Sequence, residues 1–223
     1  MATNIPPHNL GEVIDGILLL MEQPDCTLEE LMQCIKGPDF PTGGIIMGYA
    51  GMRAAYATGR GKITLRGKTS FETVRGRESI IITEIPYMVN KARLVESIAD
   101  HAKDNRIEGI YHIQDESSRE GMRVVIELKK DANPQIVLNK LLSYTQLQDT
   151  IGVNLLALVN GEPKVLTLKQ ILEQYLQFQV EVITNRTKYE LKKAEKRAHL
   201  LQGFVVAIDH IDEVIAILRS SRT

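Results

Sequence analysis

The sequence predicts an α+β protein, with a split β-α-β-β-α-β domain followed by a long projecting coiled-coil helix and short C-terminal helices. The first observation is the order of strands and helices between Ser79 and Val159, which is that of ferredoxin-like domains. The second is apolar 3-4 spacing after Leu166 that no Gly or Pro interrupts before Gly203. The third is composition: 43% of the 223 residues are apolar and 25% are charged, so the chain can form a core.

The first ten residues cannot form a regular helix, because the consecutive Pro6 and Pro7 fix the backbone and hold Ile5 in an extended conformation. Short helices are expected after them, and a capping box of Thr27 and Glu30 begins the second. These helices cover residues 10–21, 27–35 and 48–58, and a Pro- and Gly-rich loop at 36–44 precedes the last.

The β-α-β-β-α-β order rests on β-branched runs that alternate with segments of helical apolar spacing. Residues 79–85, for example, are rich in isoleucine and end at Pro86, which is typical of a strand. The expected strands cover residues 79–85, 107–113, 122–128 and 152–159, and the expected helices cover 90–104 and 133–147. Because this arrangement hosts many unrelated functions, it indicates none of them by itself.

The long helix is predicted over residues 166–202. About 37 residues at 1.5 Å each extend roughly 55 Å, so such a helix must project from a compact domain. Its apolar seam, typical of a helix packed against a partner helix, consists of Leu168, Ile171, Tyr175, Phe178, Val182 and Tyr189. We expect a break at Gly203 and one or two further helices over residues 204–218.

Charge and cysteine content exclude several classes of protein. The formal net charge is -1, so any nucleic-acid site must come from a local arrangement of charges. The longest apolar run near the start, residues 17–21, is far shorter than the ~20 residues of a membrane span, and we expect neither a span nor a signal peptide. Cys26 and Cys34 have no histidine nearby, which indicates cytosolic thiols rather than a zinc site or a disulfide.

A local excess of positive charge covers residues 59–77, which contain six basic residues and one acidic residue. Alternate side chains of a strand share a face, and cations at this spacing suit a phosphate backbone. The residues expected to share the basic face are Arg60, Lys62, Arg66 and Lys68, opposite Ile63 and Leu65. A solvated edge strand, protected from aggregation by its charges, explains the same pattern and stays open as the alternative.

No complete active site is visible in the sequence. The five histidines are scattered, and no carboxylate or serine lies at a catalytic spacing from any of them. The acidic turn at residues 115–120 is expected to pair with Arg119 and Arg123 rather than to bind a metal. A second basic run, residues 186–197, is expected to be a solvated helix face with Glu–Lys pairs.

Ile5 is unusual because the two prolines hold it rigid beside the polar Thr3 and Asn4, where it is poorly placed to join a core. Apolar wedges of this kind insert between base steps and kink a duplex. The alternative is a hydrophobic staple onto Leu10 or Val13 of the following helix. On these residues alone, the staple is the favoured interpretation.

Five segments, spread over essentially the whole chain, resemble the A subunit of bacterial DNA gyrase, a type IIA DNA topoisomerase. They are residues 1–10 (MATNIPPHNL), 37–42 (GPDFPT), 59–62 (GRGK), 84–92 (EIPYMVNKA) and 115–123 (DESSREGMR). Asn4 and residues 159–164 (VNGEPK) resemble gyrase more than the related topoisomerase IV, whose subunits often carry Asp at the position of Asn4.

The resemblance implies an ATP-dependent enzyme that introduces negative supercoils by passing one duplex through a double-strand break in another. Magnesium and ATP would belong to the gyrase B subunit in an A2B2 heterotetramer, and this segment would hold no cofactor or metal. The nucleophilic tyrosine would lie upstream on a winged-helix domain, since none of the seven tyrosines here has its context. Residues 1–165 would form the tower domain, and residues 166–223 the first coiled-coil arm of a homodimeric exit gate.

The same resemblance implies double-stranded DNA as the partner, with Ile5 intercalating to bend it, in a cytoplasmic, chromosome-associated protein. The implied DNA-binding residues are Thr3, Asn4, Ile5, Arg60, Lys62, Arg66 and Lys68. Two rival interpretations remain. One is a topoisomerase IV subunit, which acts in decatenation, and the other is a free-standing coiled-coil scaffold whose ferredoxin-like head binds a protein or an RNA.

Overall fold

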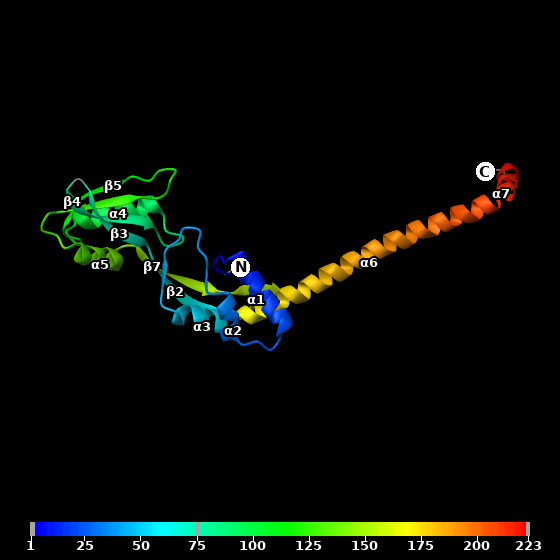
Figure 1. Ribbon diagram of the computed structural model, residues 1–223, viewed down its shortest axis with the longest axis horizontal. Coiled ribbons are helices and arrows are strands. Elements are labelled where there is room, and N and C mark those ends of the chain that lie inside the picture. Colours follow the sequence, from blue (N-terminus) through cyan, green and yellow to red (C-terminus); the bar gives the residue numbers. More distant parts are fainter. Residues whose placement is uncertain (1–2, 75, 222–223) are drawn as a thin grey trace. The chain divides into compact units, whose positions relative to one another are not determined.

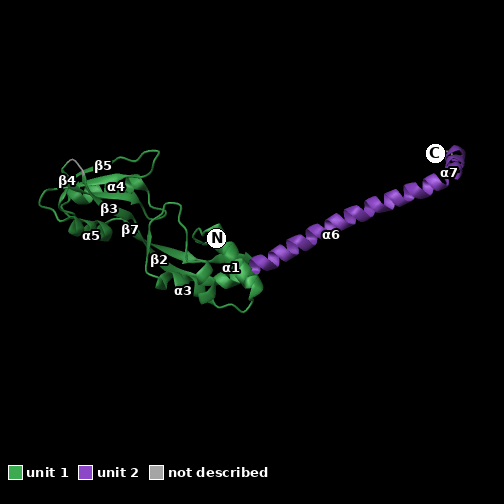
Figure 2. Ribbon diagram, viewed as in Figure 1, with its two compact units in different colours: residues 1–173 green, residues 174–223 purple. Residues whose placement is uncertain are grey.

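The computed structural model describes residues 3–74 and 76–221 and confirms the predicted α+β class (Figure 1). The chain divides into two compact units, Met1–Glu173 and Gln174–Thr223 (Figure 2). The helices are α1 (Leu10–Glu22), α2 (Leu28–Cys34), α3 (Ala50–Thr58), α4 (Lys91–Lys103), α5 (Pro134–Tyr144), α6 (Leu168–Asp209) and α7 (Ile211–Ser220). The strands are β1 (Ile45–Met47), β2 (Arg60–Arg66), β3 (Lys68–Val74), β4 (Arg77–Glu84), β5 (Ile110–Asp115), β6 (Val124–Leu128), β7 (Gln148–Asn154), β8 (Leu156–Val159) and β9 (Glu162–Val165).

The first three helices form where the sequence predicts them, since their starts are encoded locally. The Asn9 side chain accepts hydrogen bonds from the first turn of α1, and Thr27 and Glu30 form the predicted capping box of α2. Helix α3 ends at Gly59, whose φ of 77° is the left-handed conformation that glycine adopts most readily.

A four-stranded antiparallel sheet, in the order β3-β4-β6-β5, contains the larger core of the first unit. Helix α4 connects β4 to β5 along the chain, and β6 lies between these two strands in the sheet. This is a split βαβ arrangement. Helices α4 and α5 pack against the sheet. The buried side chains of the core include Ile80, Ile82, Leu94, Ile98, Val124, Ile126, Val137 and Leu141.

The last strand of the predicted β-α-β-β-α-β order pairs elsewhere. Residues 152–159 divide between β7, which pairs with β2 in a second sheet, and β8, which forms a hairpin with β9. The place beside β4 is taken by β3, which precedes it in the chain. A hairpin between neighbouring strands closes a short loop at little cost in chain entropy, and this favours β3 as the partner of β4.

The second sheet has three strands in the order β1-β2-β7. Strands β2 and β7 pair over their full length, from Arg60 opposite Asn154 to Arg66 opposite Gln148. All the residues of the four-stranded sheet therefore lie between these two strands in the sequence. The inserted segment begins and ends at one point, where the Gly67 N–H donates to the Leu147 carbonyl at 2.8 Å.

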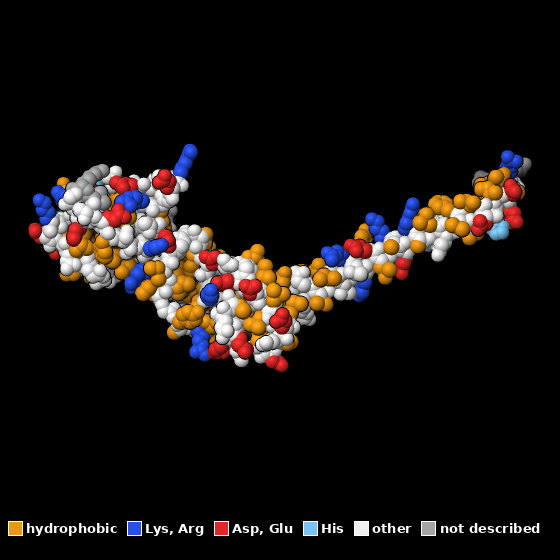
Figure 3. All heavy atoms as spheres, viewed as in Figure 1, with side chains coloured by type: hydrophobic (Ala, Val, Ile, Leu, Met, Phe, Trp, Pro, Cys, Tyr) orange, Lys and Arg blue, Asp and Glu red, His pale blue; other side chains and the backbone are white. Residues whose placement is uncertain are grey.

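Helix α6 runs for 42 residues and passes through Gly203, so the predicted break at that glycine is wrong. A glycine within a helix costs only about 1 kcal/mol relative to alanine, and the residues on both sides of Gly203 continue the helix. The break comes instead at His210, before α7. The seam residues from Tyr175 to Tyr189 are exposed, and apolar side chains are visible along this unit in Figure 3. None of the described helices combines the length and the apolar character needed to cross a membrane.

Candidate nucleic-acid interface

Strand β2 separates basic and apolar side chains as its sequence predicts. Ile63 and Leu65 are 2% and 0% exposed, whereas Arg60 and Lys62 are exposed and Arg66 is half-buried. The alternation follows from the two-residue period of a strand. One face of β2 therefore packs in the interior, and the other presents its cations.

Helix α3 covers the apolar side of β2 at very close range. A Cβ atom added at Gly51 would collide with the Lys62 carbonyl oxygen, and one added at Gly61 would lie 2.6 Å from the Gly51 oxygen and 2.7 Å from the Ala55 Cβ. The two glycines therefore let the helix backbone lie directly against the strand. This contact sets the short distance between β2 and α3. The basic side of β2 therefore faces away from the helix.

Strand β7 contributes only neutral side chains to the basic side of the sheet, because residues directly opposite each other in an antiparallel pair project to the same face. We call this surface the open basic face. It consists of Arg60, Lys62, Thr64 and Arg66 from β2 and of Gln148, Thr150, Gly152 and Asn154 from β7. The β7 residues carry no charge, and no signal in the sequence marks them as part of the site.

The cations of the open basic face have no acidic partner among the described residues. Arg60, Lys62 and Arg66 form no ion pair there, and Arg66 instead donates from Nε and Nη2 to the Gln148 Oε1, at 2.9 and 2.7 Å. This interaction holds the Arg66 guanidinium in place and leaves its charge uncompensated. Three positive charges without acidic partners among the described residues, on a neutral sheet surface, form a suitable site for a polyanion.

Lys68 does not belong to the open basic face, contrary to the sequence prediction. It lies beyond Gly67 on β3, in the four-stranded sheet, where its Nζ is 3.3 Å from the Glu84 Oε1. Glu84 also accepts a hydrogen bond from the Gly44 N–H, and this bond, followed by Lys68, holds the pKa of its carboxyl below the ordinary value. The alternation rule failed because the chain leaves one sheet and enters another at Gly67.

The N-terminal segment lies along the free edge of β7. Asn4 and Asn154 exchange two backbone hydrogen bonds of 3.0 Å, and the Thr3 hydroxyl donates to the Leu156 carbonyl at 2.8 Å. The following residue, Ile5, is 47% exposed, and Leu10 is 74% exposed. These exposures argue against a staple between Ile5 and Leu10, whereas Val13, the other expected partner, is half-buried. The structure thus brings Thr3, Asn4 and Ile5 to the edge of the sheet that carries Arg60, Lys62 and Arg66.

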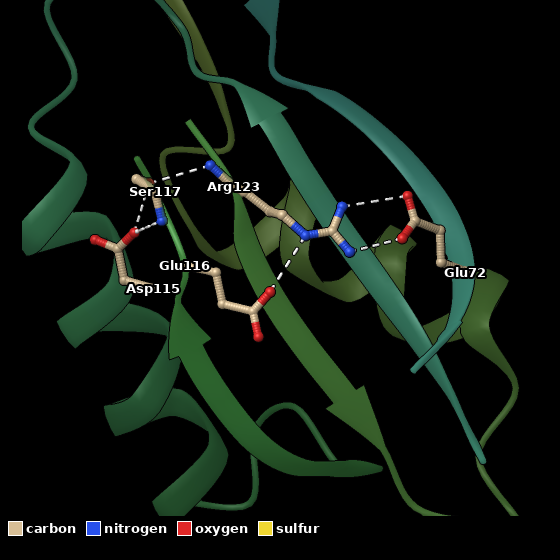
Figure 4. Close-up of polar contacts among 5 residues, drawn as sticks. All are labelled: Glu72, Asp115, Glu116, Ser117 and Arg123. Atoms are coloured by element: carbon tan, nitrogen blue, oxygen red, sulfur yellow. Dashed lines mark hydrogen bonds and ion pairs between the residues drawn. The ribbon is translucent and has the colours of Figure 1, made fainter. Parts of the chain in front are cut away.

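A second group of charges behaves differently (Figure 4). Arg123 donates from Nη2 to Glu72 at 2.7 Å and from Nε to Glu116 at 3.2 Å, and Glu72 is the largest cause of the raised Arg123 pKa. The Asp115 carboxylate is 2.6 Å from the Lys91 Nζ and accepts from Ser117, and together these lower its pKa to about 2, with Lys91 the larger cause. The cluster joins β3, the β5–β6 connection and the start of α4.

The acidic turn at residues 115–120 therefore pairs with Arg123 as predicted. Arg119 forms no ion pair with a described residue, and Glu72 and Lys91 take part as partners that the sequence did not predict. Over residues 3–74 and 76–221, no three His, Cys, Asp or Glu side chains are grouped so that they could share a metal ion. The basic run at 186–197 is exposed on α6, but its expected Glu–Lys pairs are not formed within the described part of the chain.

Comparisons with known proteins show which family the chain belongs to. A family model that describes the A subunit of DNA gyrase and topoisomerase IV matches residues 1–223. The chain is 63% identical over 224 residues to the DNA gyrase A subunit of Clostridium acetobutylicum, and 59% identical over 223 residues to that of Halalkalibacterium halodurans; each match covers 100% of this chain. The DNA gyrase A subunit of Synechocystis is 56% identical over 226 residues and 99% of this chain. The chain spans only 27%, 27% and 26% of the lengths of these three relatives.

Proposed function

Since the chain belongs to the family of DNA gyrase and topoisomerase IV A subunits, we propose that it is the DNA-bending and DNA-holding part of a gyrase A subunit. The whole enzyme would be an ATP-dependent type II DNA topoisomerase that introduces negative supercoils. The relatives reported above are gyrase subunits, and this favours gyrase over topoisomerase IV. Their identity over nearly the whole chain likewise favours a gyrase segment over a free-standing scaffold.

The single observation that carries the proposal is the open basic face. Its three cations lack acidic partners among the described residues, so the phosphates of a duplex would neutralise them without breaking ion pairs within the protein. Thr3 and Asn4, at the β7 edge, would contact the same duplex. Ile5, exposed beside them, would insert between base steps and bend it.

The larger assembly would use both parts of the chain. Residues 1–165 would act as the tower domain, and residues 166–223 as one arm of a coiled coil leading to the exit gate of a homodimer. The gyrase B subunit would complete an A2B2 heterotetramer in the cytoplasm and hold magnesium and ATP. DNA cleavage would require a tyrosine outside this segment.

Two sets of substitutions in the full-length protein, in complex with the B subunit, test the proposal. Replacing Arg60, Lys62 and Arg66 together by Ala should weaken binding to a linear duplex and reduce the log–log salt slope by about 0.9 for each phosphate that the variant no longer neutralises. Ile5→Ala should leave that slope unchanged and reduce the bend angle, read by energy transfer between dyes at the duplex ends, because the wedge offsets part of a bending cost of about 1–6 kcal/mol.

Lys68→Ala is the matched control, because this lysine is already paired with Glu84 and lies in the other sheet. Its salt slope should equal that of the wild type. If the triple Ala variant keeps the wild-type slope as well, the open basic face does not contact DNA. If Ile5→Ala keeps the bend and instead lowers stability by about 2–5 kcal/mol, Ile5 is a core residue and not a wedge.

A further inference from the structure

Ile5 is fixed in space by its neighbours rather than by contacts of its own backbone. Upstream, Asn4 is paired with Asn154 on β7. Downstream, hydrogen bonds are formed at Pro6, Pro7 and His8 in succession, while Ile5 makes none with a described residue. The direction in which its side chain projects therefore depends on these flanking anchors.

The downstream anchor nearest to Ile5 is the ring of His8. Its Nδ1 lies 2.8 Å from the Pro6 carbonyl oxygen, and its Nε2 lies 2.7 Å from the Tyr56 hydroxyl. A carbonyl oxygen can only accept, so Nδ1 carries the proton and donates to Pro6. Nε2 then presents a lone pair, and the Tyr56 hydroxyl donates to it. Together, the two hydrogen bonds connect Tyr56, through the His8 ring, to the carbonyl group of Pro6, the residue that follows Ile5.

Tyr56 is a rigid support for this connection, because it lies on α3 and is only 1% exposed. Burial lowers the pKa of His8 and raises that of Tyr56, so both groups stay neutral near pH 7 and keep the donor and acceptor roles described. Helix α3 also lies directly against β2 through Gly51 and Gly61. One helix therefore supports both the segment that carries Ile5 and the strand that carries the cations.

We propose that His8 and Tyr56 are a positioning pair for DNA bending, which holds the Pro6 peptide so that Ile5 stands at a fixed place at the β7 edge of the three-stranded sheet. This inference rests on the proposed function. The pair acts through Ile5, and neither side chain needs to touch the duplex. Removing the Tyr56 hydroxyl would release only this anchor, because the Asp39 N–H still donates to the Pro7 carbonyl at 2.9 Å and His8 still bridges to Pro38.

The test uses the full-length protein in complex with the B subunit, and a duplex with dyes at its ends. Tyr56→Phe keeps the packed ring and removes one donor, so the ratio of bent to straight duplex should fall about two- to ten-fold, the value of one neutral hydrogen bond. The salt slope should not change. His8→Leu should have the same effect, and His8→Gln should restore part of the bending, because an amide offers both a donor and an acceptor.

Two controls separate positioning from general damage. Tyr49→Phe, near the start of the same helix, removes an exposed hydroxyl that donates to the Lys36 carbonyl at 3.3 Å, and should bend DNA as the wild type does. A duplex already bent by a central bulge should restore wild-type binding to Tyr56→Phe, since the wedge is then no longer needed to create the bend.

The outcomes separate this inference from the function on which it rests. The positioning role is overturned if Tyr56→Phe bends the straight duplex normally while Ile5→Ala does not. It is also overturned if Tyr56→Phe binds the bulged duplex as poorly as the straight one, since its defect would then be structural. If Ile5→Ala itself bends DNA normally, the proposed wedge is wrong, whatever Tyr56→Phe does.

Discussion

The two sheets of the first unit differ in whether their basic side chains form ion pairs. In the four-stranded sheet, cations meet carboxylates: Arg123 meets Glu72 and Glu116, and Lys68 meets Glu84. In the three-stranded sheet, Arg60 and Lys62 face only neutral residues of β7. The change occurs across a single glycine, between Arg66 and Lys68. Basic residues only two positions apart can therefore have different surroundings, and the difference lies in the strand opposite each of them.

The contrast extends to the apolar side chains. The four-stranded sheet buries a large aliphatic core under α4 and α5, so its charges stabilise a surface that is already well supported. The three-stranded sheet is covered on one side by α3 and exposes the other. An uncompensated cluster of cations adds little to stability, and this supports the proposal that the surface serves binding rather than folding.

The largest expected effect is on the core of the four-stranded sheet. Ile126→Ala removes a fully buried side chain of β6 and should lower the free energy of unfolding by about 2–5 kcal/mol, measured by chemical denaturation. Ile136→Ala, on the nearby α5, is the control: this side chain is 57% exposed, and its loss should change stability by less than about 0.5 kcal/mol. Equal losses in the two variants would mean that this sheet does not carry the core described.

An intermediate effect is expected where α3 meets β2. Gly51→Ala introduces a methyl group against the Lys62 carbonyl, so the helix must move away, at a cost of about 1–3 kcal/mol in unfolding free energy. Gly152→Ala is the matched control on the open basic face, because a Cβ there meets no atom within 4 Å. It should leave stability unchanged or raise it slightly. A neutral Gly51→Ala would show that the helix does not lie directly on the strand.

The smallest expected effect concerns pH. Lys91, followed by Ser117, lowers the pKa of Asp115 from 3.8 to about 2, so the folded state binds this proton less readily than the unfolded state does. Stability from this carboxylate is therefore fully present above pH 3.8 and is lost as the pH falls through about 2. The difference in unfolding free energy between wild type and Asp115→Asn should shrink over that interval. Arg60→Gln, which removes a cation with no acidic partner among the described residues, should show no such change.

Local sequence patterns predicted many of the helices and strands, but they did not predict which elements distant in the sequence would be in contact. The alternation in residues 60–66 correctly opposed Ile63 and Leu65 to the cations, because that period belongs to the strand itself. It failed at Lys68, because nothing near Gly67 reveals that the next strand joins another sheet. The alternation within β2 also could not predict that the residues opposite the cations, on β7, would be neutral.

The missed helix end has a related cause. Gly203 carries a real local penalty, but the penalty is small compared with the continuous helical propensity around it. The alternative staple of Ile5 onto Leu10 and the expected Glu–Lys pairs on α6 were also short-range predictions. The exposure of Ile5 and Leu10 argues against that staple, and the described residues of the exposed basic run form no ion pair. Short-range rules thus predicted elements well and contacts poorly.

The insertion of the four-stranded sheet between β2 and β7 has a consequence for the order of folding. Even the nearest paired residues of these strands, Arg66 and Gln148, are 82 positions apart, and contacts of such separation form slowly. The inserted sheet, once folded, brings Gly67 and Leu147 within one hydrogen bond of each other and so removes most of that search. We therefore expect β2 and β7 to pair last, after the four-stranded sheet inserted between them has folded.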